Sequence, residues 1–152
     1  MNHPQTIDLG KRALFIPAEV KVSVAFDQAH QPNLPHPPYE NCYAIWDTGA
    51  MRTTISPKIA QKLGLKSIGL SKMQHANGEA LVNTYLINLL LPNKIEIHTL
   101  TVSEGAIPDV DALIGMDIIS LCDFAITNKD GRTLFSFDIP SCREVDFTQG
   151  DC

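Results

Sequence analysis

The sequence contains one Asp-Thr-Gly run, which directly follows the apolar, strand-like segment 44–46. A strand that ends here would hold the carboxylate of Asp47 rigidly, and Thr48 would place a hydroxyl beside it. Gly49 has no Cβ, so a second backbone can approach the acid closely. The segment therefore presents a carboxylate to another chemical group, and the chain has a single copy of it. The alternative interpretation is a strand that ends in an ordinary Asx-type turn.

A second apolar segment, 112–119, contains a glycine and continues into a helix-like pattern. Asp47-Thr48-Gly49-Ala50 together with Leu113-Ile114-Gly115 resembles the paired motifs of the retropepsin-like aspartic proteases, the retroviral-type, single-domain relatives of pepsin. In that family the hydrophobic-hydrophobic-Gly segment passes beneath the Asp-Thr-Gly loop. The resemblance covers roughly residues 12–138. It implies an all-β, closed and partly barrel-like fold with a flap hairpin and one or two short helices.

The resemblance also implies a reaction. Hydrolysis of a peptide bond by carboxylates needs one group that takes a proton from water and another that gives a proton to the substrate. Two carboxylates a few ångströms apart cannot both ionise, so they share one proton and take opposite roles. Because this chain has one Asp-Thr-Gly run, a working site requires a C2 homodimer with both copies of Asp47 on the axis. We therefore expect a homodimeric aspartic endopeptidase that activates water between two Asp47 carboxylates, without a cofactor.

The resemblance implies roles for individual residues as well. The catalytic group would comprise Asp47, Thr48 and Gly49, with Thr48 donating to the loop of the partner and the Gly49 N–H binding a carboxylate oxygen. The expected substrate-binding residues are Ala50, Met51, Arg52, His75, Ala76, Asn77 and Gly78. The expected supporting residues are Leu113, Ile114, Gly115 and Asp117.

Several of these residues have simpler explanations. The apolar ones can be plain core, the hairpin tip can be an ordinary surface turn, and His75 can be merely exposed. Asp117 sits at a helix start, where a carboxylate caps free N–H groups, and it could also pair with Arg52. For Asp117 we favour a structural role over substrate contact. Position 50 holds Ala where pepsin-type sites usually hold Ser, so a hydroxyl donor is missing, and we expect an optimum in mildly acidic to near-neutral solution.

Short apolar segments between turn signals predict a mostly β chain without an internal repeat. The expected strands lie within 14–26, 44–46, 53–55, 72–91, 95–102, 124–126 and 134–137. Residues 72–91 predict a hairpin with Asn77-Gly78 as a type I′ turn, and 84–91 a further strand. Ser56 as N-cap, Pro57 and Gly64 bound a first helix, and a second reaches Leu121. The proline-rich stretch 28–40 predicts a loop.

Composition excludes several classes of partner. Twelve basic and seventeen acidic residues give a net charge of −5, which argues against nucleic acid or an anionic membrane surface. The apolar runs are too short to cross a bilayer. The first residues lack the features of a signal peptide, so we expect a cytoplasmic protein.

The four cysteines and five histidines show no metal-ligand spacing, so no metal is expected. In a reducing compartment the cysteines would be free thiols, two of them buried, and a Cys142–Cys152 bridge is the alternative.

The sequence predicts an N-terminal arm over 1–11, a protease domain over 12–139 and a C-terminal tail over 140–152. Many relatives dimerise through interleaved terminal strands, but this tail is a poor strand candidate. The mode of dimerisation therefore stays open, with 134–139 as one candidate surface. Two other functions also stay open: a catalytically silent dimer that binds peptides in the same groove, and a processing domain excised from a polyprotein. Retaining Asp47 favours catalysis, since a pure binder could avoid the desolvation of two facing carboxylates by using Asn.

Overall fold

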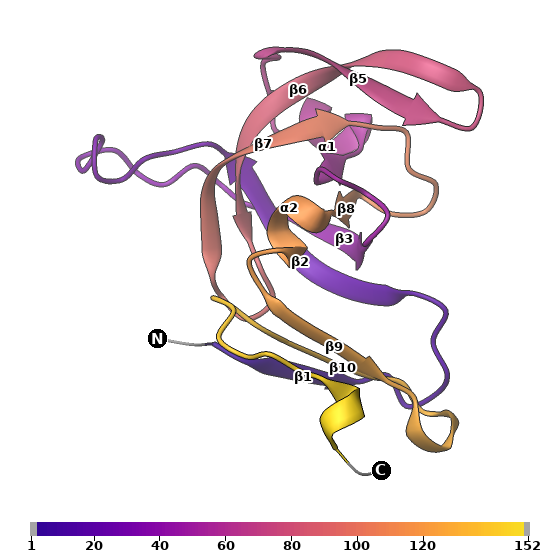
Figure 1. Cartoon of the computed structure of the whole chain (residues 1–152). Helices are drawn as coiled ribbons and strands as arrows, with labels where there is room; N and C mark the ends of the chain where they lie inside the picture. Colours follow the sequence, from indigo (N-terminus) through magenta and orange to yellow (C-terminus); the bar gives the residue numbers. More distant parts are fainter. Residues whose placement is uncertain (1–2, 151–152) are drawn as a thin grey trace.

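The computed structural model describes residues 3–150, with the backbone alone for His75. Two sheets and two short α-helices make up the fold (Figure 1). The strands are β1 Gln5–Asp8, β2 Ile16–Val24, β3 Glu40–Trp46, β4 Thr54–Ile55, β5 Gly69–His75, β6 Gly78–Leu90, β7 Glu96–Glu104, β8 Ala112–Ile114, β9 Asp123–Thr127 and β10 Leu134–Asp138. The α-helices are α1 Pro57–Lys62 and α2 Met116–Ile119, and the 3-10 turns are η1 Lys129–Gly131 and η2 Phe147–Gln149.

The larger sheet closes on itself. Its strand order is β2-β3-β8-β4-β7-β6-β5, and β2 also pairs with β6. The pairing of β2 with both β3 and β6 makes a ring, with β5 outside it as one arm of the β5–β6 hairpin. The core fills this ring with side chains such as Val22, Ile55, Ile87, Val102 and Ile114, all at 0% exposure. The expected all-β, closed and partly barrel-like architecture is confirmed.

The smaller sheet has the order β1-β10-β9 and lies across one end of the barrel (Figure 1). Its strand β1 falls in the region expected to be an N-terminal arm. The central strand β10 has both edges paired, so the edges of 134–138 are not free for a second chain. Strand β9 pairs along one edge only within the described chain. Edge strands of this kind are templates for pairing with another chain.

Helix α1 begins and ends where the sequence predicts. The Ser56 hydroxyl accepts a hydrogen bond from the Ile59 N–H at 3.3 Å, and Pro57 occupies the first turn. Gly64 follows the helix with φ +61°, a conformation that costs glycine little. The helix buries Ile59 and Ala60 against the barrel.

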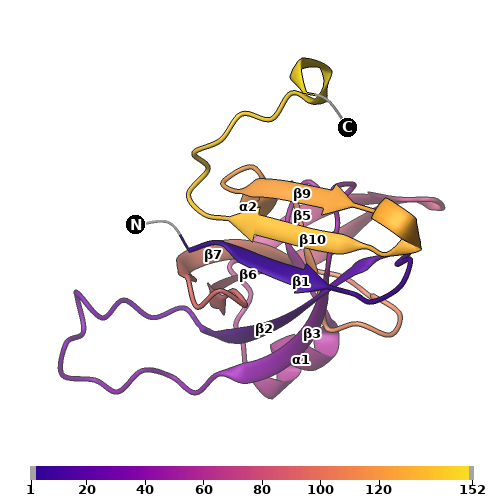
Figure 2. The same ribbon diagram turned by 90° about the horizontal axis from the view of Figure 1, so that it is seen from below.

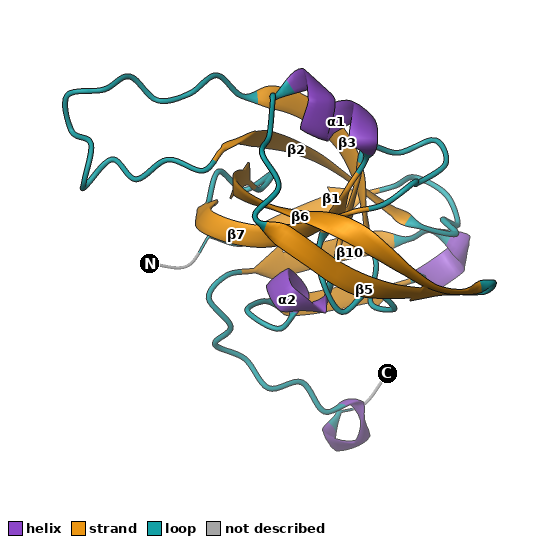
Figure 3. Ribbon diagram, turned by 90° about the horizontal axis from the view of Figure 1, so that it is seen from above, coloured by secondary structure: helices purple, strands orange, loops and turns teal. Residues whose placement is uncertain are grey.

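The β5–β6 hairpin corrects two predictions. Its turn residues are Ala76 and Asn77, because His75 pairs with Gly78. Gly78 has φ +117°, whereas neither turn residue has a positive φ, so the expected type I′ turn at Asn77-Gly78 is wrong. The expected strand 84–91 has other bounds: it is the second part of β6, which begins at Gly78 and runs over thirteen residues to Leu90. The hairpin projects from the barrel (Figure 3).

The loop 25–39 corresponds to the predicted proline-rich loop, and its return leg is fixed to β7. The Tyr39 hydroxyl donates to the Glu96 carboxylate at 2.6 Å, and His36 stacks on Tyr39 with ring centroids 4.6 Å apart. Burial, followed by this hydrogen bond to Glu96, raises the pKa of Tyr39 to about 12.

Cys42 and Cys122 are free thiols, whereas Cys152, and with it the alternative Cys142–Cys152 bridge, lies outside the described residues. Burial raises the pKa of Cys42 to about 12 and that of Cys122 to about 11, which keeps both thiols protonated at neutral pH. No helix in residues 3–150 is both long enough and apolar enough to span a membrane.

Candidate active site

Asp47 stands at the end of β3, where the chain leaves the barrel. The Asp47 N–H donates to the Ile114 carbonyl at 2.8 Å, which continues the parallel pairing of β3 with β8. The Gly49 N–H donates to Asp47 Oδ1 at 2.8 Å, and the Ala50 N–H donates to the Asp47 carbonyl at 3.2 Å. One carboxylate oxygen is therefore fixed by the backbone of its own loop. A Cβ on Gly49 would lie 3.1 Å from the same oxygen.

The segment after β8 passes directly beneath this loop. The Met116 N–H donates to the Ala50 carbonyl at 2.7 Å, and the Asp117 N–H donates to the Met51 carbonyl at 3.1 Å. A Cβ on Gly115 would lie 2.7 Å from the carbonyl carbon of Arg52 and 2.8 Å from the Ala50 oxygen. Both neighbours are backbone atoms, which cannot rotate away. Only glycine fits at this crossing without a backbone shift.

Asp117 stabilises the Asp47 loop through hydrogen bonds to the residues that follow it. Its carboxylate accepts the Thr53 N–H at 2.9 Å and the Thr53 hydroxyl at 2.8 Å. The same carboxylate accepts the Ile118 N–H at 3.0 Å, in the first turn of α2. The Thr53 hydroxyl in turn accepts the Gly115 N–H at 3.2 Å. The carboxylate thus ties α2 to the strand that leaves the Asp47 loop, in place of the ion pair with Arg52 considered above.

The β5 strand reaches the barrel close to this loop. A Cβ on Gly105 would lie 2.7 Å from Thr54 Cγ2 and 3.6 Å from Met73 Cε, so these three residues meet at one point. Because Thr54 follows the Asp47 loop by a few residues, the part of β5 near the hairpin turn lies beside the wall of the site. Gly105 is not predictable from the sequence, because a single glycine between a strand and a loop has no distinguishing pattern.

The expected substrate-binding residues fall into two groups. Ala50 is half-buried in the loop, whereas Met51 and Arg52 are exposed, Met51 at 88%. Ala76, Asn77 and Gly78 are exposed at the far end of the hairpin, and the side chain of His75 lies outside the described part of the structure. The expected supporting residues Leu113 and Ile114 lie in β8, with Ile114 fully buried.

Thr48 is exposed and lies between two grooves. One, of about 910 Å³, is lined by Thr48, Met116, Ile119, Phe124 and Ile126 among others. The other, of about 220 Å³, is lined by Thr48, Leu14, Phe15, Phe124 and Ile126 among others. Strand β9 contributes to both.

The surface around Thr48 is apolar and exposed. Leu14 is 84% exposed and Phe15 is 55% exposed, next to Ile126 at 43%. The sequence predicts Leu14 and Phe15 at the start of a strand, but β2 begins at Ile16 and they precede it. Leu14 and Phe15 are adjacent apolar residues, which breaks the alternation of apolar and polar residues expected in a strand. This break is the sequence feature that could have shown that they lie outside β2. Large apolar side chains exposed around one groove are a feature of interaction surfaces.

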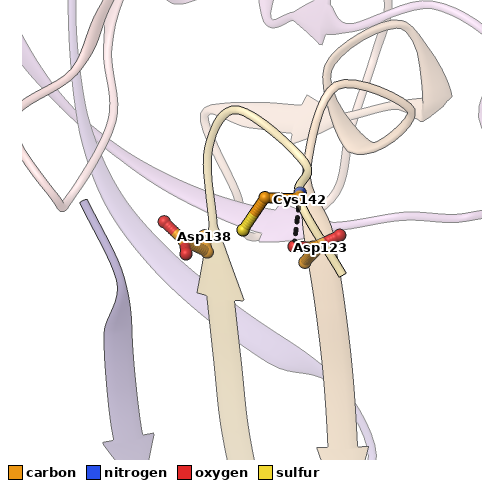
Figure 4. Close-up of side chains that lie close together, drawn as sticks. All are labelled: Asp123, Asp138 and Cys142. Atoms are coloured by element: carbon orange, nitrogen blue, oxygen red, sulfur yellow. Dashed lines mark hydrogen bonds between the residues drawn. The ribbon is translucent and has the colours of Figure 1, made fainter. Parts of the chain in front are cut away.

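A second cluster of polar groups lies at the ends of β9 and β10 (Figure 4). One ligand atom from each of Asp123, Asp138 and Cys142 lies within 4.8 Å of the others. The Arg143 guanidinium contacts Asp138 Oδ2 at 2.7 Å and Asp123 Oδ2 at 3.6 Å. A cation of the chain already balances these carboxylates, so the cluster is a structural junction rather than a candidate metal centre.

Known proteins share both the sequence pattern and the fold. The model of the gag-polyprotein putative aspartyl protease family matches residues 40–120, which include the Asp47 loop and the Gly115 crossing. A retropepsin-like aspartic protease from Rickettsia conorii is similar in structure, with a TM-score of 0.56 and 16% identity, over 91% of this chain and 96% of that one. That similarity confirms the expected retropepsin-like fold.

Two further structures are more distant. The protease of Simian Foamy Virus (mac) has a TM-score of 0.45 and 15% identity, over 68% of this chain and 91% of that one. The retroviral protease-like domain of Ddi1 from Leishmania major has a TM-score of 0.44 and 13% identity, over 79% of this chain and 94% of that one. A comparison with curated proteins gave no match.

Proposed function

The chain belongs to the family of gag-polyprotein putative aspartyl proteases, and from this we propose that it is an aspartic endopeptidase active as a homodimer. The observation that carries the proposal is the Asp47 loop. It holds one carboxylate by a backbone N–H at 2.8 Å, and the Gly115 segment crosses beneath it. Each chain supplies one such loop, so the second carboxylate must come from a second copy.

The chemistry follows from two Asp47 carboxylates that share one proton. The ionised carboxylate takes a proton from water while the water oxygen attacks the carbonyl carbon of the peptide. The protonated carboxyl gives its proton to the carbonyl oxygen. When the C–N bond breaks, the leaving nitrogen takes the proton of one carboxyl, and a hydroxyl of the tetrahedral intermediate gives its proton to the other carboxylate, so the pair again shares one proton. Within each loop the Gly49 N–H keeps one carboxylate oxygen in place, and the exposed Thr48 would donate its hydroxyl to the loop of the partner.

The face around Thr48 supports a dimer axis at this position. Two grooves flank Thr48, the larger of them mostly apolar, and β9 borders both of them. The free edge of β9 lies on this face, so two copies can join their β9 edges antiparallel about a two-fold axis. Pairing of this kind joins the small sheets of both chains. It also brings the two Asp47 loops together.

The peptide would lie between the Asp47 loops and the β5–β6 hairpins. Hairpins that close over an extended peptide add strand-like hydrogen bonds and exclude water. The position of Met73 beside Gly105 supports this role, because Met73 lies near the hairpin turn and Gly105 lies beside Thr54 in the wall of the site.

The direct test is cleavage of a diverse mixture of unstructured peptides at a series of protein concentrations. A site shared by two chains predicts that the cleavage rate per chain falls on dilution below the dissociation constant of the dimer. Sedimentation over the same range must show the transition from dimer to monomer. A rate per chain that stays constant while the protein becomes monomeric contradicts the proposal.

Substitution of Ala50 by Ser tests the chemical environment of the site. A serine hydroxyl at this position can donate to the carboxylate pair and stabilise its ionised form. We expect the profile of kcat/KM against pH to move toward lower pH by about one unit. The control is Ala50→Cys, which adds a group of similar size but a weaker donor. A wild-type optimum below about pH 3, or no movement in the Ser variant, contradicts this explanation.

A further inference from the structure

The C-terminal tail, residues 141–150, leaves the small sheet and does not return to it. Figure 2 shows the tail passing β9 on the side opposite β10, with η2 separated from the rest of the chain. All of its residues are exposed. Two of them are large and apolar: Val145 is 66% exposed and Phe147 is 80% exposed.

The root of the tail is firmly attached to the start of β9. The Asp123 carboxylate accepts the Ser141 hydroxyl at 2.5 Å and the N–H groups of Cys142 and Arg143 at 2.9 and 3.0 Å. These hydrogen bonds, led by that of Cys142, lower the pKa of Asp123. The ionised Asp123 carboxylate therefore stabilises the attachment of the root at pH values above the ordinary pKa of an aspartate. This stabilisation is lost as the pH falls through the lowered pKa. The direction in which the tail leaves the body is fixed at neutral pH.

Beyond the root the tail is ordered only by its own contacts. The Asp146 carboxylate accepts the Thr148 N–H at 2.9 Å and the Thr148 hydroxyl at 2.6 Å, and the Gln149 N–H donates to the Asp146 carbonyl at 3.2 Å. Within the described residues, 144–150 make no hydrogen bond to the rest of the chain. The segment has a defined conformation, yet the side chains of Val145 and Phe147 are exposed. These two side chains therefore lack an apolar partner within the described part of the chain.

The groove of about 910 Å³ lies between this tail and β9. Val145 and Phe147 line its outer side, and Phe124, Ile126 and Met116 line its inner side. It continues to Thr48, where the proposed function requires a second copy. We propose that the occupant of this groove is a second copy of the chain, and that the tail clasps it as an arm, with Val145 and Phe147 packed on the partner.

Charge supports this occupant. If two β9 strands pair antiparallel, the start of one lies beside the end of the other, so the root of each tail lies near the partner's β9–β10 turn. This turn carries Lys129, Asp130 and Arg132, of which Arg132 also pairs with Asp8 at 3.5 Å, whereas the tail carries Glu144 and Asp146 beyond its root. A turn with a net positive charge therefore lies near a tail segment with a net negative charge in both symmetric contacts.

The inference rests on the proposed homodimer, and sedimentation equilibrium tests it without reference to catalysis. The variants are Phe147→Ser and a chain that ends at Arg143, which keeps the root. Loss of two buried phenylalanines per dimer is expected to weaken the dimer about a hundred-fold. The matched control is Leu34→Ser, which removes an apolar side chain that is 55% exposed on the loop 25–39, away from the tail in Figure 2. It should leave the dissociation constant unchanged.

Amide hydrogen exchange of residues 144–150 distinguishes packing on the partner from packing on the same chain. The arm predicts protection that appears only at concentrations where the dimer forms. Protection of 144–150 at every concentration would contradict the proposal that the tail packs on the partner. Dissociation constants of both tail variants within two-fold of wild type would contradict it as well. Neither result would contradict the dimer itself. A wild-type chain that sediments as a monomer at all concentrations overturns the proposed function and the arm together. Variants with a weakened dimer should regain full activity per chain at high concentration.

Discussion

Replacing Asp47 with asparagine is expected to lower peptide hydrolysis by at least about a thousand-fold. The asparagine side chain has the same shape and can still accept the Gly49 N–H that binds Asp47 Oδ1 at 2.8 Å. It cannot take a proton from water or give one to the substrate at the pH of the reaction. The loss should appear in kcat, measured with a defined peptide selected from the cleaved mixture.

The Asp47→Asn variant should remain a dimer. It removes two facing acids of which one must take up a proton and the other must be held as a desolvated charge when the dimer forms, so dimer affinity should be equal or greater. Equal cleavage by wild type and variant would locate the activity outside Asp47. Absence of cleavage by the wild-type dimer at every pH, with peptide still bound, would favour the silent peptide-binding dimer instead.

Replacing Gly115 with alanine is expected to destabilise the fold by about 3 kcal/mol. The new Cβ would lie 2.7, 2.8 and 2.9 Å from backbone atoms of Arg52 and Ala50. The backbone would have to separate at the point where the Met116 N–H donates to the Ala50 carbonyl at 2.7 Å. Thermal unfolding should show a midpoint lower by roughly 10 °C. Activity should fall as well, because the Asp47 loop rests on this crossing.

Gly150→Ala is the matched control for Gly115→Ala. Gly150 has an extended backbone with φ −129° and no heavy atom within 4 Å of the added Cβ. This variant should unfold within about 0.5 kcal/mol of wild type. Equal stability of Gly115→Ala and wild type would mean that the two segments do not cross as closely as described.

Much of the site could be predicted from the sequence because its constraints are local. An acid after an apolar strand, followed by a hydroxyl and a glycine, defines the Asp47 loop before any tertiary contact is known. The Gly115 segment was predictable for a similar reason, since an apolar pair before a glycine suits a close crossing. Helix α1 was also predictable, because Ser56, Pro57 and Gly64 mark its two ends.

The remaining features depend on contacts between distant segments. Strand β1 has no strong periodicity and exists because it pairs with β10, about 130 residues away. The hairpin turn lies one residue earlier than predicted, because the pairing of His75 with Gly78 overrides the local preference of Asn-Gly for the turn. Likewise, the exposure of Leu14 and Phe15 beside Thr48 depends on where the loop before β2 lies relative to β9. No local pattern carries that information.

The measurement that most directly tests the shared site is the activity of mixed dimers. Wild type and Asp47→Asn chains are combined in equal amounts and allowed to exchange partners at a fixed total concentration. If each site needs Asp47 from both chains, random pairing leaves about a quarter of the activity of wild type alone. If each chain carries a complete site, about half of the activity remains, and the account of a proton-sharing pair on the dimer axis is contradicted.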